Sequence, residues 1–169
     1  MKIINDYVRL MLFCGGLLLG IQIPALTDQY TKRVDAKLLE SSQLLAGFQL
    51  TAERYFSGNI EQLISHYKQS NDAVFKQDAQ NIQFIFERVK RLKEEFAALQ
   101  GNGLSKAFHV LFSHDSAIMQ ETLSSYSYVI ILDPMAFVWG FACALLLSSF
   151  IESLMKLVGL CIFKTTKTR

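Results

Sequence analysis

Residues 10–26 read LMLFCGGLLLGIQIPAL and residues 134–163 read PMAFVWGFACALLLSSFIESLMKLVGLCIF, the second broken only by Glu152 and Lys156. A bilayer core about 30 Å thick is crossed by about 20 mostly apolar helical residues, and each stretch supplies them once its flanking residues are counted. We therefore predict an all-α membrane protein in which two transmembrane helices flank an extramembrane antiparallel helical bundle. The predicted domains are residues 1–27 (first transmembrane helix), 28–128 (periplasmic, coiled-coil-like helical domain), 129–163 (second transmembrane helix) and 164–169 (basic cytoplasmic tail).

Composition agrees with this division. The chain of 169 residues is 51% hydrophobic, yet it keeps 19% charged residues, most of them between the two apolar stretches. The formal net charge of +2 is too small to favour nucleic acid as a partner. Cys14, Cys143 and Cys161 lie in or beside the apolar stretches, so packing of helices, and no disulfide framework, must hold the central region together.

The charges at the two ends predict the orientation. The first stretch follows Lys2 and Arg9, as a signal peptide would, but no clear small-x-small cleavage site comes after it, so we expect it to be retained as an anchor. The other end is also basic, with Lys156, Lys164, Lys167 and Arg169. Because short basic segments stay on the cytoplasmic side, the sequence predicts a bacterial inner-membrane protein with both termini cytoplasmic and the central domain periplasmic.

Two central segments carry mostly apolar residues three or four positions apart, which is typical of a packed helix face. The first seam contains Val34, Leu38, Ser41, Leu45, Phe48, Ala52 and Tyr55, and the second contains Phe75, Ala79, Ile82, Ile85, Val89, Leu92, Phe96 and Leu99. Shorter amphipathic helices are predicted around residues 60–67, with Asn59 as the N-cap, and 104–112. Asp115 should then cap a further turn or two through Leu123. Asp133-Pro134 should begin the second span, with Tyr126, Tyr128 and Trp139 near the lipid headgroups. The sequence leaves open whether the seams close within one chain or between chains.

Small residues recur four apart in both spans, a spacing that lets helices approach closely in lipid. They are Gly16 and Gly20 in the first span, and Gly140, Ala144 and Ser148 in the second. The second ridge continues to Glu152 and Lys156, and Arg9 shares a face with the two glycines of the first. We predict an intramembrane ion pair among Arg9, Glu152 and Lys156; in the alternative interpretation, Glu152 and Lys156 simply pair with each other at the interface.

No pattern in the chain predicts catalysis. His66, His109 and His114 lack the spacing of metal ligands, and the sequence contains neither a G-x-S-x-G turn nor a glycine-rich phosphate loop. We therefore expect no catalytic residue, no metal and no cofactor. The charged run around Arg88 and Arg91 is interpreted as a solvated helix face, with a docking surface for an acidic partner as the alternative.

Several short motifs occur in a fixed order: Gln22-Ile23-Pro24, Asp28-Gln29-Tyr30, Ser70-Asn71-Asp72 followed by Phe75, and Tyr126-Ser127-Tyr128 before the proline-led second span. In this layout the chain resembles a small family of bacterial two-span inner-membrane proteins of unknown function, DUF2937. The resemblance implies an inner-membrane location and supplies no catalytic residues.

The expected function is that of a non-enzymatic, homo-oligomeric inner-membrane protein whose periplasmic helices mediate self-assembly or binding to an envelope partner. The expected partners are membrane lipid, further copies of the chain, and another inner-membrane or periplasmic protein. Two alternatives remain: a pore or transport subunit lined by second-span residues, and a sensory input module whose output passes through a separate partner.

Overall fold

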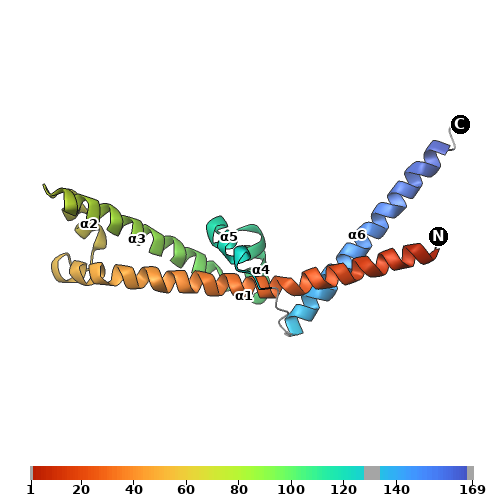
Figure 1. Cartoon of the computed structure of the whole chain (residues 1–169), viewed down its shortest axis with the longest axis horizontal. Helices are drawn as coiled ribbons and strands as arrows, with labels where there is room; N and C mark the ends of the chain where they lie inside the picture. The colour runs from red at the N-terminus through yellow and green to blue at the C-terminus, as the bar shows by residue number, and fades with distance from the viewer. Residues whose placement is uncertain (1, 128–133, 167–169) are drawn as a thin grey trace. The chain divides into compact units, whose positions relative to one another are not determined.

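The computed structural model describes residues 2–127 and 134–166, with side chains for residues 6–127 and 134–153. In these ranges every regular element is a helix, so the predicted all-α class is confirmed. The six helices are α1 (Lys2–Tyr55), α2 (Ile60–Lys68), α3 (Ala73–Ala98), α4 (Gly103–Phe112), α5 (Ser116–Ser124) and α6 (Pro134–Thr166) (Figure 1). The predicted cap Asp133 and the aromatic residue Tyr128 lie outside the described residues.

The chain divides into two compact units. Unit 1 comprises Met1–Asp28 and Tyr126–Arg169, and unit 2 comprises Gln29–Ser125. Helix α1 contributes to both, because it continues from the first apolar stretch into the first seam without a break. Pro24 lies inside it and has no N–H to donate to the carbonyl of Gly20. One turn later the Thr27 hydroxyl donates to the Ile23 carbonyl at 2.8 Å.

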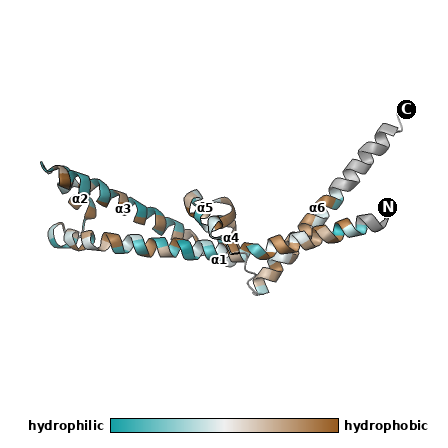
Figure 2. Ribbon diagram, viewed as in Figure 1, coloured by the Kyte–Doolittle hydropathy of each residue, from teal (hydrophilic) through white to brown (hydrophobic). Residues whose placement is uncertain are grey.

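Helices α1 and α6 are each long and apolar enough to cross a membrane. Hydrophobic residues follow one another along the described part of α6, whereas hydrophilic residues predominate on α3 (Figure 2). The helices of unit 1 are thus suited to lipid on composition, and α3 is suited to water.

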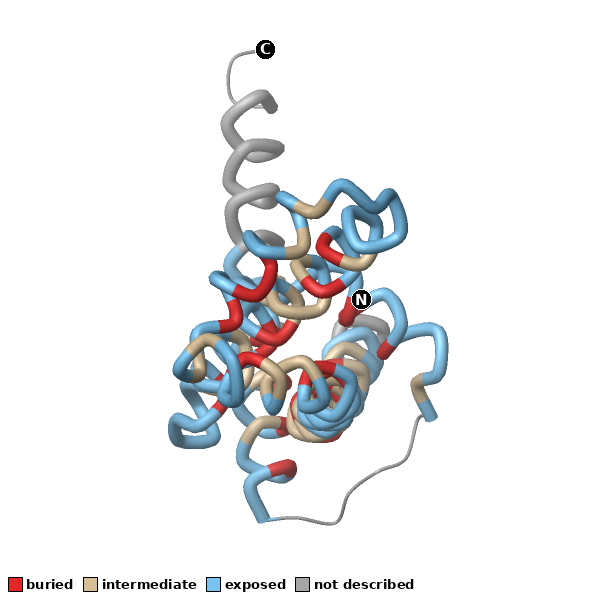
Figure 3. The backbone as a smooth tube through the Cα atoms, turned by 90° about the vertical axis from the view of Figure 1, so that its left-hand side faces the viewer, coloured by how far each residue is buried: buried red, intermediate tan, exposed pale blue. Residues whose placement is uncertain are grey.

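Unit 2 has a hydrophobic core of its own, built from α1, α2 and α3. Its buried members are Leu45, Ala52, Ile60, Leu63, Ile64, Ile82 and Val89, with Leu38, Phe48 and Ile85 among the half-buried residues packed against them. Val34 and Leu92 are also buried, and Phe96 is half-buried. Along the backbone tube, buried positions recur at intervals between exposed ones (Figure 3). Members of both seams therefore pack into one core within this chain.

The seams are shorter than the spacing predicts. Tyr55, the last member of the first seam, is exposed, because α1 ends there and Phe56 packs on the core in its place. Phe75, the first member of the second seam, is also exposed, although its ring packs edge-on against the Tyr67 ring of α2. The two ring centroids are 5.1 Å apart.

Side-chain caps begin the helices that follow α1. Asn59 accepts from the Gln62 N–H at 3.0 Å, and Asp115 accepts from the N–H groups of Ala117 and Ile118 at 2.9 and 3.1 Å. Both were predicted as N-caps, and both satisfy donors that the first turn of a helix leaves without a partner. Asp72 and Asn102 cap α3 and α4 in the same way.

Ser41 is the polar member of the first seam and gives the first prediction. Its hydroxyl is buried and has no hydrogen-bond partner within the described residues, which costs folding free energy. We expect Ser41→Ala to raise the free energy of unfolding by about 1 kcal/mol, measured by urea unfolding with circular dichroism. Ser42→Ala on the same helix is the matched control and should gain only a few tenths of a kcal/mol from helix propensity. Equal gains in the two variants would show that burial of the hydroxyl carries no cost.

Candidate functional site

In unit 1, α1 and α6 approach until their backbones touch, and small residues make this possible. Gly16, Gly20, Gly140 and Ala144 are all buried. A Cβ atom on Gly20 would lie 2.5 Å from the Trp139 carbonyl oxygen, and one on Gly16 would lie 2.8 Å from the Ala144 Cα atom. The structure therefore brings together four of the five residues predicted from the small-residue spacing. Such contacts matter in lipid, where close packing replaces the hydrophobic effect as the source of helix association.

The fifth residue, Ser148, is half-buried and lines a small cavity of about 70 Å³ together with Arg9 and Glu152. The Arg9 Nη2 and Glu152 Oε2 atoms lie 4.0 Å apart, at the outer limit of an ion pair. In water a pair this exposed would contribute little, whereas at the edge of a membrane two opposite charges on facing helices attract more strongly. The side chain of Lys156 lies outside the described residues, so its part in this pair stays a prediction.

A second polar contact joins the ends of the two chain segments of unit 1. The Tyr126 hydroxyl donates to the Gln22 Oε1 atom at 2.7 Å. Gln22 belongs to the first apolar stretch, where its amide needs a protein partner if lipid surrounds the helix. Tyr126 supplies that partner just before the chain enters its second apolar stretch.

In unit 2 the main polar cluster forms around Tyr30, which is fully buried. Its hydroxyl donates to Glu95 Oε1 of α3 at 2.7 Å and accepts from the backbone N–H of Asp115 at 2.8 Å. The same Glu95 oxygen lies 2.8 Å from His109 Nε2 of α4. Glu95 thus joins α1, α3 and α4, and Tyr30 extends the connection to the cap of α5. Burial, together with the hydrogen bond to Glu95, raises the pKa of the Tyr30 phenol, which keeps it a neutral donor.

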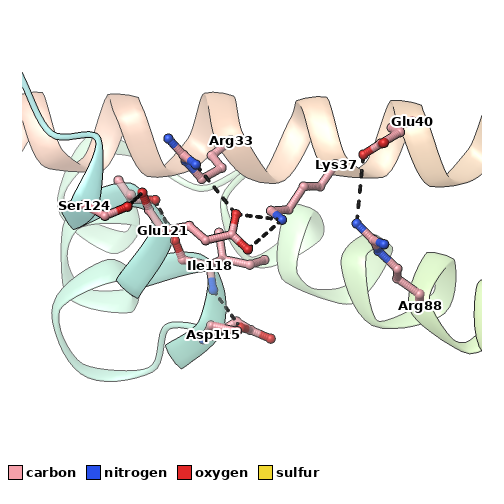
Figure 4. A network of polar contacts seen from close by, with 10 residues as sticks. Arg33, Lys37, Glu40, Arg88, Asp115, Ile118, Glu121 and Ser124 are labelled. Carbon is pink, nitrogen blue, oxygen red and sulfur yellow. Dashed lines mark hydrogen bonds and ion pairs between the residues drawn. The ribbon is translucent and has the colours of Figure 1, made fainter.

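Ion pairs also join the helices of unit 2. Glu121 of α5 points toward Lys37 and Arg33 of α1, with oxygen–nitrogen distances of 2.8 and 3.6 Å, and Arg88 of α3 lies 3.9 Å from Glu40 (Figure 4). The hydrogen bond from Lys37 and the positive charges of Lys37 and Arg33 lower the pKa of the Glu121 carboxyl. This pairing therefore stabilises unit 2 fully above the pKa of an unfolded glutamate, and the stabilisation is lost as the pH falls below it.

An open groove of about 710 Å³ runs between α3 and the α4–α5 pair. Phe84, Leu92 and Ile118 are among its apolar lining residues, and Arg88, Arg91 and Glu94 are among the charged ones. Most of its charges already have partners within unit 2, as Lys37, Arg88 and Glu95 show. The groove is therefore a surface whose charged side chains mostly pair within unit 2. Such a surface is suited to helix packing or to contact with another protein.

The three histidines occupy separate places. His109 contacts Glu95, the His114 Nδ1 atom lies 2.8 Å from the Val110 carbonyl oxygen, and His66 packs against Phe56 with ring centroids 5.5 Å apart. Within the described ranges, no three histidine, cysteine or acidic side chains are grouped so as to hold a metal ion.

The Tyr30 cluster is the feature that sequence reasoning missed. Tyr30 stands four residues before Val34, so extending the seam backwards by one step would have reached it. Nothing in the spacing predicts Glu95 and His109 as its neighbours, because they come from helices far along the chain and their side chains meet only after folding.

Close packing in unit 1 gives the second prediction. We expect Gly20→Val to force α1 and α6 apart, because its first side-chain carbon would overlap the backbone at Trp139 and Gly140. In mild detergent the variant should lose several degrees of melting temperature, and the emission of Trp139, the only tryptophan, should change. Gly15→Val is the matched control, because a Cβ atom there meets nothing within 4 Å. If both variants melt as the wild type does, the contact has no role in stability.

Removal of one hydroxyl tests the cluster in unit 2. Tyr30→Phe leaves the Glu95 carboxylate and the Asp115 N–H short of a buried partner, and should cost about 1–3 kcal/mol in the free energy of unfolding. Urea unfolding measures this cost. Tyr55→Phe, which changes an exposed tyrosine of the same helix, should stay within about 0.5 kcal/mol of the wild type. Equal stability of the two variants would contradict the structural importance of the cluster.

Comparison with known proteins places the chain in a family. No curated protein and no solved structure matches it. The family described as protein of unknown function, DUF2937, matches residues 4–163. This match covers nearly all of the chain, including both apolar stretches and the whole of unit 2, so the protein belongs to the DUF2937 family.

Proposed function

We propose that the protein is a non-enzymatic, homo-oligomeric inner-membrane protein whose periplasmic antiparallel helical bundle mediates self-assembly or binding to another envelope protein. In this proposal α1 and α6 are the membrane anchors and both termini are cytoplasmic. The proposal has three parts, namely anchoring, orientation and association, and each has its own support.

Exposure of the apolar helices supports anchoring. In the most apolar windows of α1 and α6, only 28% and 22% of the residues are buried, whereas a core helix of a water-soluble protein is mostly buried. Leu19 of α1 and Leu146 of α6 are among the large apolar side chains left open. Lipid is the solvent in which such exposure is favourable. The contact of Gly16 and Gly20 with α6 also gives the first helix a structural role that a cleaved signal peptide would not have.

The sequence supports the orientation. Basic residues lie at both ends of the chain, and the sequence of unit 2 comes between the two apolar stretches. The positive-inside bias then keeps both ends in the cytoplasm, which leaves unit 2 on the periplasmic side.

One observation supports the association of this chain with a second helix. On α1, Leu39, Gln43, Ala46 and Leu50 are spaced four, three and four residues apart and form a second stripe. It lies on the side of the helix away from the buried positions Ser41, Leu45 and Ala52. Leu39 is 61% and Leu50 is 59% exposed. Residues of the seams and of the glycine ridges already pack within one chain, so this stripe is a face of α1 that is left for a second helix to cover.

The stripe can be tested by substitution. We expect the wild type to migrate as a multiple of 19.2 kDa in mass photometry in mild detergent, after the mass of the detergent is subtracted. Leu39→Gln combined with Leu50→Gln should weaken association about tenfold or more, because two apolar contacts are lost at each interface.

Leu44→Gln is the matched control, because Leu44 is 55% exposed on the same helix but lies outside the stripe. It should leave the oligomer intact. Loss of the oligomer in the control as well would show that the stripe is not the interface, and a wild type seen only as monomer would contradict self-assembly.

A further inference from the structure

Helix α4 exposes an apolar face that the core of unit 2 does not use. Leu104, Phe108, Leu111 and Phe112 share one side of the helix, and all four are exposed. Its buried residues, Ala107 and Val110, are smaller and lie beside this face, with Ala107 next to Leu104 and Leu111. The helix therefore packs on unit 2 through its smaller apolar residues and directs its larger ones outward, the reverse of the arrangement usual in water.

The chemistry of this face is that of an interfacial helix. The rings of Phe108 and Phe112 stack with centroids 5.9 Å apart, and Phe112 is 75% exposed. No charged residue belongs to the face, because the Lys106 and His109 positions lie on other sides of the helix and His109 is held by Glu95. Phenylalanine and leucine on one face, with a basic residue on another, is the pattern of helices that lie in the boundary layer of a bilayer.

The connections of α4 to the rest of the chain favour lipid over a protein partner. Glu95 and Asp115, on either side of α4 in the sequence, both contact Tyr30. Tyr30 follows Leu26, the last residue of the first apolar stretch, by four helical residues, which rise only about 6 Å. The α4–α5 pair is thus fixed to the part of α1 that directly follows the apolar stretch.

We propose that the exposed face of α4 is a lipid-binding surface, whose leucine and phenylalanine side chains enter the interfacial layer of the bilayer that holds α1 and α6. The inference rests on the membrane anchoring in the proposed function and is independent of the association. It assigns unit 2 a second attachment to the membrane, made through side chains and not through the spanning helices.

Lipid contact can be read from fluorescent labels on the full-length chain. Cys14, Cys143 and Cys161 are replaced by alanine, and single cysteines carrying an environment-sensitive nitrobenzoxadiazole label are introduced as Phe108→Cys, Phe84→Cys and Leu146→Cys. Each protein is reconstituted into phosphatidylcholine–phosphatidylglycerol vesicles, with or without lipids that carry a nitroxide quencher. The quencher is high on the acyl chain for the α3 and α4 labels and near its end for the Leu146 label. Phe112→Cys provides a second reporter of the α4 face, and circular dichroism confirms that each variant is folded.

Phe84 is the matched control. It is 60% exposed, against 59% for Phe108, but it precedes Glu95 on α3 by eleven residues, about 16 Å along the helix. We expect the labels at Phe108 and Phe112 to emit at shorter wavelength than the label at Phe84 and to be quenched about twofold more strongly by the nitroxide lipids. The label at Leu146 should be quenched as well, because it lies on the apolar helix α6.

Each other outcome has a distinct meaning. Labels at Phe108 and Phe112 that behave like the Phe84 label, with the Leu146 label quenched, would overturn the lipid-binding surface and leave the anchoring intact. A blue-shifted α4 label that lipid does not quench would also overturn it, because protein, such as a second copy, would then cover the face. An unquenched label at Leu146 would contradict the anchoring itself, and with it the proposed function.

Discussion

A buried hydroxyl determines how unit 2 is assembled. Tyr30 is fully buried, and a phenol away from water must find hydrogen-bond partners in the protein. It finds Glu95 on one side and the N–H of Asp115 on the other, and Glu95 also holds His109. Positions on four helical segments are therefore fixed by one side chain. The apolar core of α1, α2 and α3 removes large side chains from water, and the Tyr30 cluster adds directed hydrogen bonds that involve α4 and the cap of α5.

The helices of the two units are held together by different interactions. In unit 2, large aliphatic side chains such as Ile82 and Leu63 are removed from water, and the hydrophobic effect supplies the free energy. In unit 1, the contact between α1 and α6 is made by Gly16, Gly20, Gly140 and Ala144, whose burial removes little apolar surface. Such a contact is effective where the surrounding medium is itself apolar and closeness of the backbones decides the energy. The residues at each contact thus agree with the solvent that we assign to it.

Local features of the fold could be predicted from the sequence, whereas long-range polar contacts could not. The helices around the seams and the caps Asn59 and Asp115 follow from residue spacing and side-chain chemistry within a few positions. The small residues at positions 16, 20, 140 and 144 were found by the same short-range pattern. The Tyr30 cluster could not be predicted, because a hydrogen bond between residues 65 positions apart produces no periodic pattern in the sequence. The exposure of Tyr55 and Phe75 at the ends of the seams could not be predicted, because spacing does not show where a neighbouring helix stops.

Unit 2 contains no cysteine, since Cys14 and Cys143 both belong to unit 1 and Cys161 follows in α6. Its core and its polar cluster therefore form through contacts that neither an oxidising nor a reducing compartment alters. No oxidoreductase has to act on this domain before it is mature. In the topology that we propose, folding of unit 2 would therefore be indifferent to the side of the membrane, and the basic flanks of the apolar helices would set the side.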